Sequence, residues 1–463
     1  MTLIKSISGI RGTIGGRSEE GLTPDNIVKF SAGFAQWIIE TGRTKKVVVG
    51  RDGRISGEIL KGLVINVLRS MGIAVTDVDL TTTPTIEMAV PQDNAGGGIM
   101  ITASHNPEEW NALKLLDENG HFVREEASQK ILDNADQQQY SFANVYHLGA
   151  CLQNDSYGEF HINKILESSL VDEKAIENKN FKVVVDGINS TGGIFVPQLL
   201  RALGVENIIE LNCEPHGKFA HSPEPLEENL TALTKEVREK NADVGFAVDP
   251  DVDRLAIVCE DGSFFGEEYT LVSVADYVLS HYKGPVVGNL STTRALEKIA
   301  EKHEVPHYAA AVGEAHVADK MEEVQAVIGG EGNGGVIYPD LHLGRDAMAG
   351  IALFLSHMAQ SGKRPSRLRS TYPKFHMVKD KVKLDENMDL ENILNSVKDK
   401  YHKYPVNTVD GVKISFDDDW VHLRKSNTEP IIRIYAESTS ETTAKNLSEK
   451  IIVDIRNLIK EKA

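Results

Sequence analysis

The sequence predicts an α/β protein: three similar α/β domains in tandem with mixed sheets, then a smaller α+β C-terminal domain, around a central cleft. A β-branched run, a small-residue turn and an amphipathic helix follow one another three times, in residues 45–73, 181–205 and 284–305. Such short runs suit parallel strands buried on both faces, and the helices suit crossover connections. At 463 residues the chain is also too long for one ordinary hydrophobic core.

Each repeat is followed by a second strand-like run that ends in a polar loop, in residues 96–107, 242–254 and 324–335. In open α/β sheets, ligands bind beyond the carboxyl ends of the strands. The three loops are therefore expected to line one shared cleft.

The C-terminal part follows a different pattern. Residues 410–438 alternate polar and apolar side chains, which is typical of half-exposed antiparallel strands, and a helix with a basic last turn is expected over residues 441–462. We place the domains at residues 1–150, 151–257, 258–370 and 371–463.

Composition and charge narrow the function. The formal net charge of −18 argues against nucleic-acid binding, which needs a broad basic face, but a few arginines can still form a local pocket for an anionic ligand. The three cysteines are too widely spaced for a disulfide framework or a metal-ligand pattern. The sequence shows no signal peptide and no run approaching the ~18 apolar residues of a membrane span, so we expect a cytoplasmic protein.

The first polar loop reads TASHNP and brings Ser104 and His105 to the end of a buried strand. The segment after it, with Trp110 and Lys114, looks helical, so a helix cap is the simple interpretation of Ser104 alone. Beside a metal ion, the same hydroxyl could instead carry a phosphoryl group and donate it.

The second loop reads DPDVDR and places Asp249, Asp251 and Asp253 at alternating positions between two strand-like runs. Three carboxylates this close repel one another unless a cation lies among them, and hard oxygen ligands favour Mg²⁺ or Ca²⁺. A solvated acidic turn is the alternative. A calcium loop of the EF-hand type is disfavoured because Arg254 stands where that loop needs a glycine.

The third loop reads GGEGNGG and is followed by the strand-like VIYPD, so no helix N-terminus is available for a dinucleotide pyrophosphate. Glu331 and Asn333 suit hydrogen bonding to sugar hydroxyls instead.

Two further segments suggest anion binding. The segment RKSNTEPIIR offers two guanidinium groups, hydroxyls and backbone N–H groups around one turn, a suitable phosphate cradle, although an ordinary hairpin turn fits equally well. The cradle residues are Arg424, Ser426, Asn427, Thr428 and Arg433. Near the N-terminus, Arg11 lies among glycines, where a ligand can approach the backbone.

Together the four loops resemble those of the α-D-phosphohexomutase family, in the family's order and over essentially the whole chain. The resemblance implies a heart-shaped, four-domain enzyme that binds hexose phosphates. It implies that Ser104 is a phosphoserine bound to Mg²⁺ with Asp249, Asp251 and Asp253. It also implies a sugar 1,6-bisphosphate that acts as intermediate and activator and turns around before returning a phosphoryl group to the serine.

The resemblance also suggests roles for other residues. Lys114 matches the lysine that acts as general acid and base, whereas Arg11 and His105 match residues that stabilise charge on the transferred phosphoryl group. Arg254 follows the last metal ligand, as expected for a substrate-binding residue.

In one loop the sequence departs from the commonest family pattern, Gly-Glu-x-Ser-Gly-His, because Asn333 replaces the serine and Gly335 the histidine. This variant, with RDA at residues 345–347 and VGEAHVADKM nearby, is similar to a branch that includes many phosphoglucosamine mutases. Gly313, Glu314 and His316 are then expected near the sugar. We therefore favour glucosamine phosphates as substrates, with glucose or mannose phosphates as the alternative, and leave monomer and dimer open. A metal-dependent phosphomonoesterase and a sugar-phosphate sensor are the rival functions.

Overall fold

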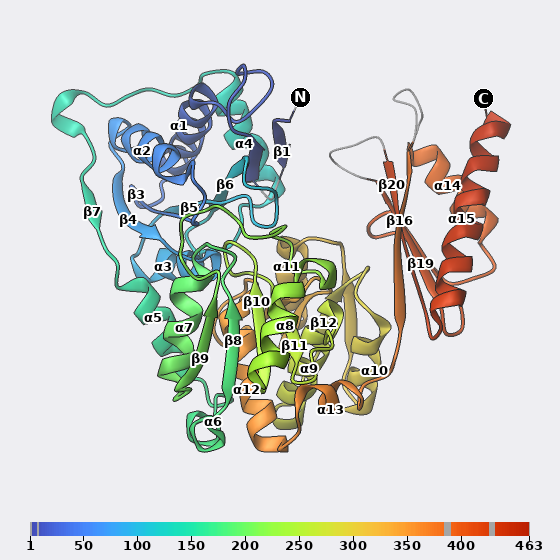
Figure 1. Cartoon of the computed structure of the whole chain (residues 1–463). Helices are drawn as coiled ribbons and strands as arrows, with labels where there is room; N and C mark the ends of the chain where they lie inside the picture. Colours follow the sequence, from blue (N-terminus) through green and yellow to red (C-terminus); the bar gives the residue numbers. More distant parts are fainter. Residues whose placement is uncertain (1, 7–8, 384–389, 426–430, 463) are drawn as a thin grey trace.

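The first domain begins with a short antiparallel pair and continues into a seven-stranded sheet in the computed structural model, which describes residues 2–6, 9–383, 390–425 and 431–462 (Figure 1). Its elements are β1 (Ile4–Ser6), β2 (Gly9–Thr13), α1 (Pro24–Glu40), β3 (Lys46–Arg51), α2 (Gly57–Ser70), β4 (Ala74–Leu80), α3 (Thr83–Gln92), β5 (Gly97–Ile101), β6 (Trp110–Leu116), α4 (Glu125–Asp136) and β7 (Cys151–Gln153).

The second domain has a four-stranded sheet, with elements α5 (Tyr157–Leu166), α6 (Glu173–Lys179), β8 (Lys182–Asp186), α7 (Gly192–Ala202), β9 (Asn207–Leu211), α8 (Thr231–Lys240), β10 (Val244–Val248) and β11 (Leu255–Cys259). The third domain also has a four-stranded sheet, with elements α9 (Glu267–His281), β12 (Val286–Asn289), α10 (Arg294–Lys302), β13 (His307–Ala310), α11 (Glu314–Val324), β14 (Ile328–Glu331), β15 (Gly335–Ile337), α12 (Ala347–Ser361) and α13 (Pro365–Arg369).

The three predicted repeats share one strand order. The sheets run β6-β5-β3-β4, β11-β10-β8-β9 and β15-β14-β12-β13, with further strands at both ends of the first. In each sheet, the strand that leads into the polar loop (β5, β10 or β14) is parallel to the first strand of the repeat (β3, β8 or β12). The strand that follows the loop (β6, β11 or β15) is antiparallel to the strand before it. The three polar loops therefore occupy the same place in three sheets, which confirms the predicted mixed α/β domains.

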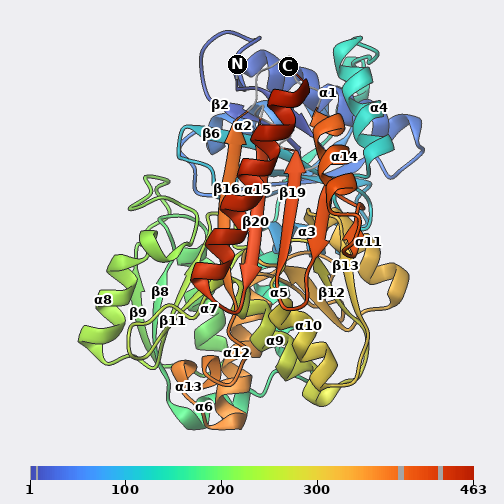
Figure 2. The same ribbon diagram turned by 90° about the vertical axis from the view of Figure 1, so that its right-hand side faces the viewer.

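The fourth domain is a five-stranded antiparallel sheet covered by helices, as the alternating pattern predicted. Its elements are β16 (His376–Lys383), α14 (Leu390–Lys400), β17 (Val406–Asn407), β18 (Val412–Ser415), β19 (Trp420–Lys425), β20 (Ile431–Ser438) and α15 (Glu441–Lys462). Figure 2 shows the long α15 lying across the face of this sheet, and Figure 1 shows the fourth domain to one side of the other three.

The helix expected around Trp110 and Lys114 is wrong, because this segment is the strand β6. It pairs with β2 on one side and β5 on the other, and residues 111–116 are buried. No helix begins in residues 103–109, all of which the structure describes, so the helix-cap interpretation of Ser104 also fails.

Strand pairing moves two of the expected domain limits by a few residues. β7 pairs with β4, so the first sheet extends beyond residue 150. β11 pairs with β10 along its whole length and therefore continues past residue 257.

The hydrophobic cores do not follow the domain limits. One continuous core joins the second and third domains, from Val183 in β8 to Ile351 in α12, whereas the first and fourth domains have cores of their own. Among the helices of the described residues, none is both long and apolar enough to cross a membrane.

Candidate active site

The loop after β5 has an unusual backbone that places Ser104 in a buried polar setting. Ser104 has a left-handed φ of 47°, which is uncommon for a residue other than glycine. Its amide donates to Thr102 Oγ1 at 2.9 Å, and the Thr102 hydroxyl donates to Asp52 Oδ2 at 2.7 Å. The strand end therefore fixes both the position and the direction of the serine.

Arg54 holds the rest of this loop and was missed from the sequence. Its guanidinium is fully buried and donates to four loop carbonyls within 2.8 Å, those of Ser104, Asn106, Pro107 and Trp110. Asp52 pairs with it at 3.1 Å. The three-fold repeat could have predicted this contact. Arg54 follows β3, and β3 is parallel to β5, so Arg54 and the loop after β5 lie at the same edge of the sheet.

The acidic loop connects β10 and β11, so strands flank it and the EF-hand alternative is excluded. All three aspartates are fully buried, and Asp249 Oδ1 accepts the amides of Asp253 and Arg254 at 3.0 and 3.1 Å. Val252 has a φ of 64°, a genuine outlier for a β-branched residue. Backbone strain and buried charge argue against a simple solvated turn.

The structure brings the two loops together. Ser104 Oγ donates to Asp249 Oδ2 at 2.6 Å, across 145 residues of sequence. The ligand atoms of the three aspartates lie within 4.8 Å of one another. A hydroxyl and a carboxylate cluster thus share one buried site.

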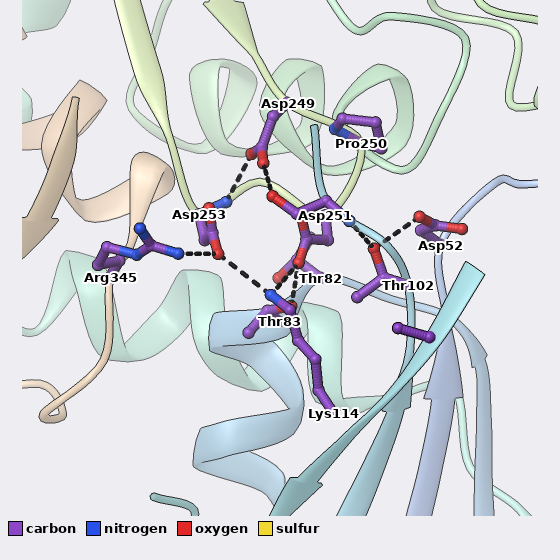
Figure 3. A network of polar contacts seen from close by, with 12 residues as sticks. Asp52, Thr82, Thr83, Thr102, Lys114, Asp249, Pro250, Asp251, Asp253 and Arg345 are labelled. Atoms are coloured by element: carbon purple, nitrogen blue, oxygen red, sulfur yellow. Dashed lines mark hydrogen bonds and ion pairs between the residues drawn. The ribbon is translucent and has the colours of Figure 1, made fainter. Parts of the chain in front are cut away.

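Two cations balance part of this negative charge (Figure 3). Lys114 Nζ lies 2.6 Å from Asp251 Oδ2 and 3.2 Å from Asp253 Oδ2, and Arg345 Nη2 lies 2.7 Å from the same Asp253 oxygen. Burial lowers the pKa of Lys114, but Asp251 and Asp253 outweigh it and hold that pKa well above its usual range. Burial and the neighbouring aspartates raise the pKa of Asp249 well above its usual value.

The donor set fits a hard divalent cation. Asp251 Oδ1 and Asp253 Oδ1 are buried and have no hydrogen-bond partner among the described residues. Leaving such an oxygen unpaired costs about 1–3 kcal/mol or more, and a bound metal ion satisfies it. Oxygen-only ligands of this kind suit Mg²⁺ or Ca²⁺.

Three guanidinium groups, one each from the first, second and fourth domains, lie close enough to interact through their charges, and two of them act on His105 beside the serine. His105 Nδ1 lies 3.3 Å from Ser104 Oγ, and burial together with Arg254 holds the pKa of His105 well below its usual range. Burial lowers the pKa of Arg11, and the charges of Arg254 and Arg433 lower it further. These guanidinium groups repel one another, so an anion bound among them is favourable.

In the sugar-loop candidate, Glu331 is buried and already bound. Its Oε1 accepts Asn289 Nδ2 at 2.8 Å and the Gly313 amide at 2.9 Å, and Arg345 Nη1 lies 2.7 Å from its Oε2. β15 follows the loop, which confirms that no helix N-terminus is present.

Other predicted residues of this region differ in burial. Asn333 is half-buried, with its side chain turned back to the Gly335 amide at 3.2 Å, and His316 is exposed. Glu314 is buried in α11, and burial raises its pKa to about 8 although Arg345 opposes the shift.

The predicted phosphate cradle is described in part. Arg424 Nε pairs with Asp410 Oδ2 at 2.6 Å, and Arg433 is exposed on the neighbouring strand β20. Ser426, Asn427 and Thr428 lie outside the described residues.

Comparison with known proteins identifies the family. Models of the phosphoglucomutase/phosphomannomutase α/β/α domains I, II and III match residues 3–141, 159–262 and 266–375, and the model of the C-terminal domain matches residues 380–452. The chain belongs to the α-D-phosphohexomutase superfamily. This confirms the family to which the sequence motifs pointed, and the protein is a phosphohexomutase, an isomerase.

Individual relatives cover almost all of this phosphohexomutase. A phosphoglucomutase/phosphomannomutase from Thermococcus kodakarensis is 38% identical over 95% of this chain and 96% of its own. A protein named as a probable phosphoglucosamine mutase, from Methanopyrus kandleri, is 32% identical over 98% of both. The crystal structure of a phosphoglucomutase/phosphomannomutase family protein from Burkholderia thailandensis superimposes with a TM-score of 0.82, at 25% identity, over 99% of this chain and 97% of its own.

Proposed function

We propose that this phosphohexomutase interconverts glucosamine 6-phosphate and glucosamine 1-phosphate through a phosphoserine at Ser104 and a sugar 1,6-bisphosphate. The observation that carries the mechanism is the 2.6 Å contact between Ser104 Oγ and Asp249 Oδ2 inside the buried acidic cluster. A serine in this place can receive a phosphoryl group and return it without releasing it to water. Glucose and mannose phosphates are the alternative substrates.

Asp249, Asp251 and Asp253 would hold Mg²⁺, with Ser104 or its phosphate as a further ligand. When bound, Mg²⁺ would neutralise the charge of the transferred phosphoryl group. The two unpaired oxygens, Asp251 Oδ1 and Asp253 Oδ1, support this assignment. The 1,6-bisphosphate would serve as intermediate and activator.

Lys114 is the proposed acid and base. Its ammonium group lies beside the acidic cluster and is held protonated there. It would give a proton to Ser104 Oγ as the O–P bond to that oxygen breaks, and the resulting amine would take the proton that the attacking sugar hydroxyl loses as its new O–P bond forms. The same amine would accept a proton in the reverse half-reaction. His105 and Arg11 would orient and stabilise the phosphoryl oxygens.

The remaining site residues would grip the substrate. The phosphate that is not reacting would be held by Arg424 and Arg433 and by residues 426–428, while Arg254 would contact the substrate beside the metal loop. Sugar hydroxyls would meet Asn333, His316, the Gly313 backbone and Glu331, whose carboxylate keeps about one free lone-pair position after three contacts.

Two observations favour an amino sugar. The loop GEGNGG, with RDA after it, is similar to the phosphoglucosamine mutase branch, and several relatives carry that name. Two buried carboxyl groups, those of Glu314 and Glu87, also line one small cavity, and burial raises the pKa of both; ionising both would make them repel each other. A sugar ammonium group nearby would relieve this repulsion, whereas a neutral hydroxyl would not.

A cytoplasmic location and small hexose phosphates as partners, without nucleic acid or membrane, complete the proposal. The acidic chain offers no broad basic face for nucleic acid. We also propose the domain limits 1–150, 151–257, 258–370 and 371–463, and the four family matches, to residues 3–141, 159–262, 266–375 and 380–452, support a division into four parts.

The test is a comparison of three substrates under one set of conditions. Glucosamine, glucose and mannose 6-phosphates are each supplied with Mg²⁺ and the corresponding 1,6-bisphosphate, and hexose 1-phosphate and inorganic phosphate are both measured. We expect kcat/KM for glucosamine 6-phosphate to exceed the others by about tenfold, since one charge pair in a buried site is worth about 1.5–3 kcal/mol.

A higher kcat/KM for glucose or mannose phosphate would contradict the proposed preference for glucosamine phosphates but not the proposed mutase reaction. Inorganic phosphate released in proportion to substrate consumed would instead show a phosphomonoesterase. The variant Ser104→Ala is the control for both product assays.

A further inference from the structure

Arg345 joins the metal loop to the sugar loop through one buried guanidinium group. It lies between β15 and α12 and is 7% exposed. Its Nη2 is 2.7 Å from Asp253 Oδ2, its Nη1 is 2.7 Å from Glu331 Oε2, and its Nε is 3.2 Å from Glu314 Oε2. Carboxylates from β14, α11 and the loop after β10 thus meet on one planar cation.

The backbone of Arg345 is fixed as well. Its amide donates to Glu314 Oε1 at 2.6 Å. The next residue, Asp346, accepts the amides of Met348 and Ala349 and thereby caps α12.

Asp346 is held in turn by two histidines, one from the second domain and one from its own domain, and both histidines contact the first domain. Its Oδ2 lies 2.8 Å from His161 Nε2 of α5 and 3.3 Å from His342 Nε2. The other ring nitrogens face Thr85 and Glu87 of α3, at 2.9 and 3.1 Å. These side chains could group around a metal ion, but three of the four ring nitrogens make hydrogen bonds and the fourth, His342 Nδ1, faces the Glu87 carboxylate. Burial lowers the pKa of His342, but Asp346 and Glu87 outweigh it and raise that pKa to about 10, so the ring is protonated and cannot bind a metal ion. The network therefore positions the loop that carries Arg345.

We propose that Arg345 is a positioning residue that sets the distance between the sugar-binding loop and the phosphoryl-transfer centre. This inference rests on the proposed mutase function. Glu331 can turn a sugar hydroxyl toward the phosphoserine only if its carboxylate keeps its place relative to Asp253. A guanidinium fork holds two carboxylates at a fixed spacing, which a flexible ammonium group does not.

Three variants test this role: Arg345→Gln, Arg345→Lys and the control Arg369→Gln. Arg369 is a partly buried arginine of the same domain that donates to the Phe265 carbonyl and lies over the Tyr269 ring, away from the site. For each variant we would measure kcat and KM with a hexose 6-phosphate, the Tm, and Mg²⁺ binding by calorimetry with Mg²⁺ alone. Asp249→Asn serves as the control without metal binding.

We expect Arg345→Gln to lower kcat by about 10- to 100-fold, the usual effect of removing a group that orients a metal ligand. Its Mg²⁺ affinity should be no weaker than that of the wild type, because a positive charge 2.7 Å from Asp253 has been removed. Arg345→Lys should keep the charge yet stay at least about tenfold slow, since it lacks the fork. Arg369→Gln should match the wild type in kcat and Mg²⁺ affinity.

A wild-type kcat in Arg345→Gln or full rescue by Arg345→Lys would overturn the proposal. So would a loss of Mg²⁺ affinity that accompanies a large fall in Tm, because that pattern marks a purely structural residue.

A double-mutant cycle with Glu331→Gln gives an independent measure. If Arg345 acts through Glu331, the double variant should be scarcely slower than the slower single variant. Fully multiplicative losses would overturn the proposal. A wild-type enzyme that does not isomerise any hexose phosphate would reject the proposed function instead, a result distinct from all of these.

Discussion

The proposed metal loop after β10 and the proposed sugar loop after β14 end equivalent strands of two repeated sheets, yet their carboxylates differ in how fully they are hydrogen-bonded. Among the described residues, Asp251 and Asp253 each keep one buried oxygen without a hydrogen bond, although Arg254 Nε lies 3.8 Å from Asp253 Oδ1. Glu331 accepts contacts from Asn289, Gly313 and Arg345 and has little capacity left. The loop after β10 therefore has buried oxygens that can bind a cation, whereas the loop after β14 has a carboxylate whose position is already fixed by hydrogen bonds.

The difference suggests that equivalent loops of one repeated fold serve different purposes, one for phosphoryl transfer and the other for binding the sugar. Buried oxygens without hydrogen bonds destabilise the folded protein, so we expect them where a bound ligand restores that stability. A carboxylate that is already hydrogen-bonded loses little on binding sugar and keeps its orientation. Changes in the metal loop should therefore abolish turnover, and changes at the periphery should mainly weaken binding.

The largest effect is expected at the serine. Ser104→Ala removes the oxygen that would carry the phosphoryl group, so kcat should fall by roughly 10⁴-fold or more. The fold should persist, because within the described part of the chain the serine hydroxyl makes just the short contact to Asp249 and the longer one to His105. Turnover near the wild-type rate, with an unchanged Tm, would exclude Ser104 as the phosphoryl carrier.

The next effect concerns the metal. Asp251→Asn replaces a carboxylate that has an unpaired buried oxygen, so Mg²⁺ affinity should fall by about 100-fold, together with kcat at fixed Mg²⁺. Calorimetric titration with Mg²⁺ measures this directly. Asp261→Asn, at an exposed aspartate after β11, should leave the affinity unchanged. Equal Mg²⁺ binding in both variants would place the metal elsewhere.

A smaller effect is expected at the fourth domain. Arg433→Ala should raise KM for hexose phosphates by about tenfold with little change in kcat, since a charge-assisted hydrogen bond to phosphate is worth about 1.5–3 kcal/mol. Arg456→Ala, at an exposed arginine of α15, is the matched control. If both variants show the same KM, Arg433 does not grip the phosphate.

The smallest effect is a pH dependence of stability. His422 is 1% exposed and joins the third and fourth domains. Its Nε2 donates to the Asp410 carbonyl at 2.7 Å, and the Ser291 hydroxyl donates to its Nδ1 at 2.9 Å. This pair of hydrogen bonds requires the neutral form of the imidazole. Burial lowers its pKa to about 4, below the ordinary value of 6.5. Between pH 6.5 and 4, His422 is therefore protonated in the unfolded chain but neutral in the folded protein. The free energy of unfolding falls as the pH drops through this range.

At pH 5 this loss amounts to about 2 kcal/mol relative to pH 7.5. Unfolding followed by denaturant at several pH values measures it. His422→Asn should be less stable at pH 7.5 but show a flatter pH profile, whereas His402→Asn, at an exposed histidine of the same domain, should behave as the wild type. Parallel profiles for all three proteins would contradict the assignment.

Much of the fold could be predicted because its patterns are local. The β-branched runs before each turn and the alternation in residues 410–438 are short-range signals, and they led to the correct fold class. The grouping of the three aspartates could be predicted for the same reason, since Asp249 and Asp253 lie four residues apart. The four loops also kept the order seen in the family.

Long-range partners could not be predicted in this way. Arg54 reaches carbonyls about fifty residues away, and Arg345 meets an aspartate 92 residues away. The β6 segment was misread because its strand is buried on both sides and carries no alternation, so its pattern does not separate strand from helix.

The shared core of the second and third domains has a consequence for how the chain can be divided. Apolar side chains of β8 and of α12 pack in one cluster, so a fragment ending after β11 would expose to water much of what it normally buries. Proteolytic cleavage or gene truncation at that junction should yield aggregation-prone pieces, whereas the fourth domain, with a core of its own, can be detached more cleanly. For folding, the enzyme thus consists of three cooperative blocks, although its sequence reads as four.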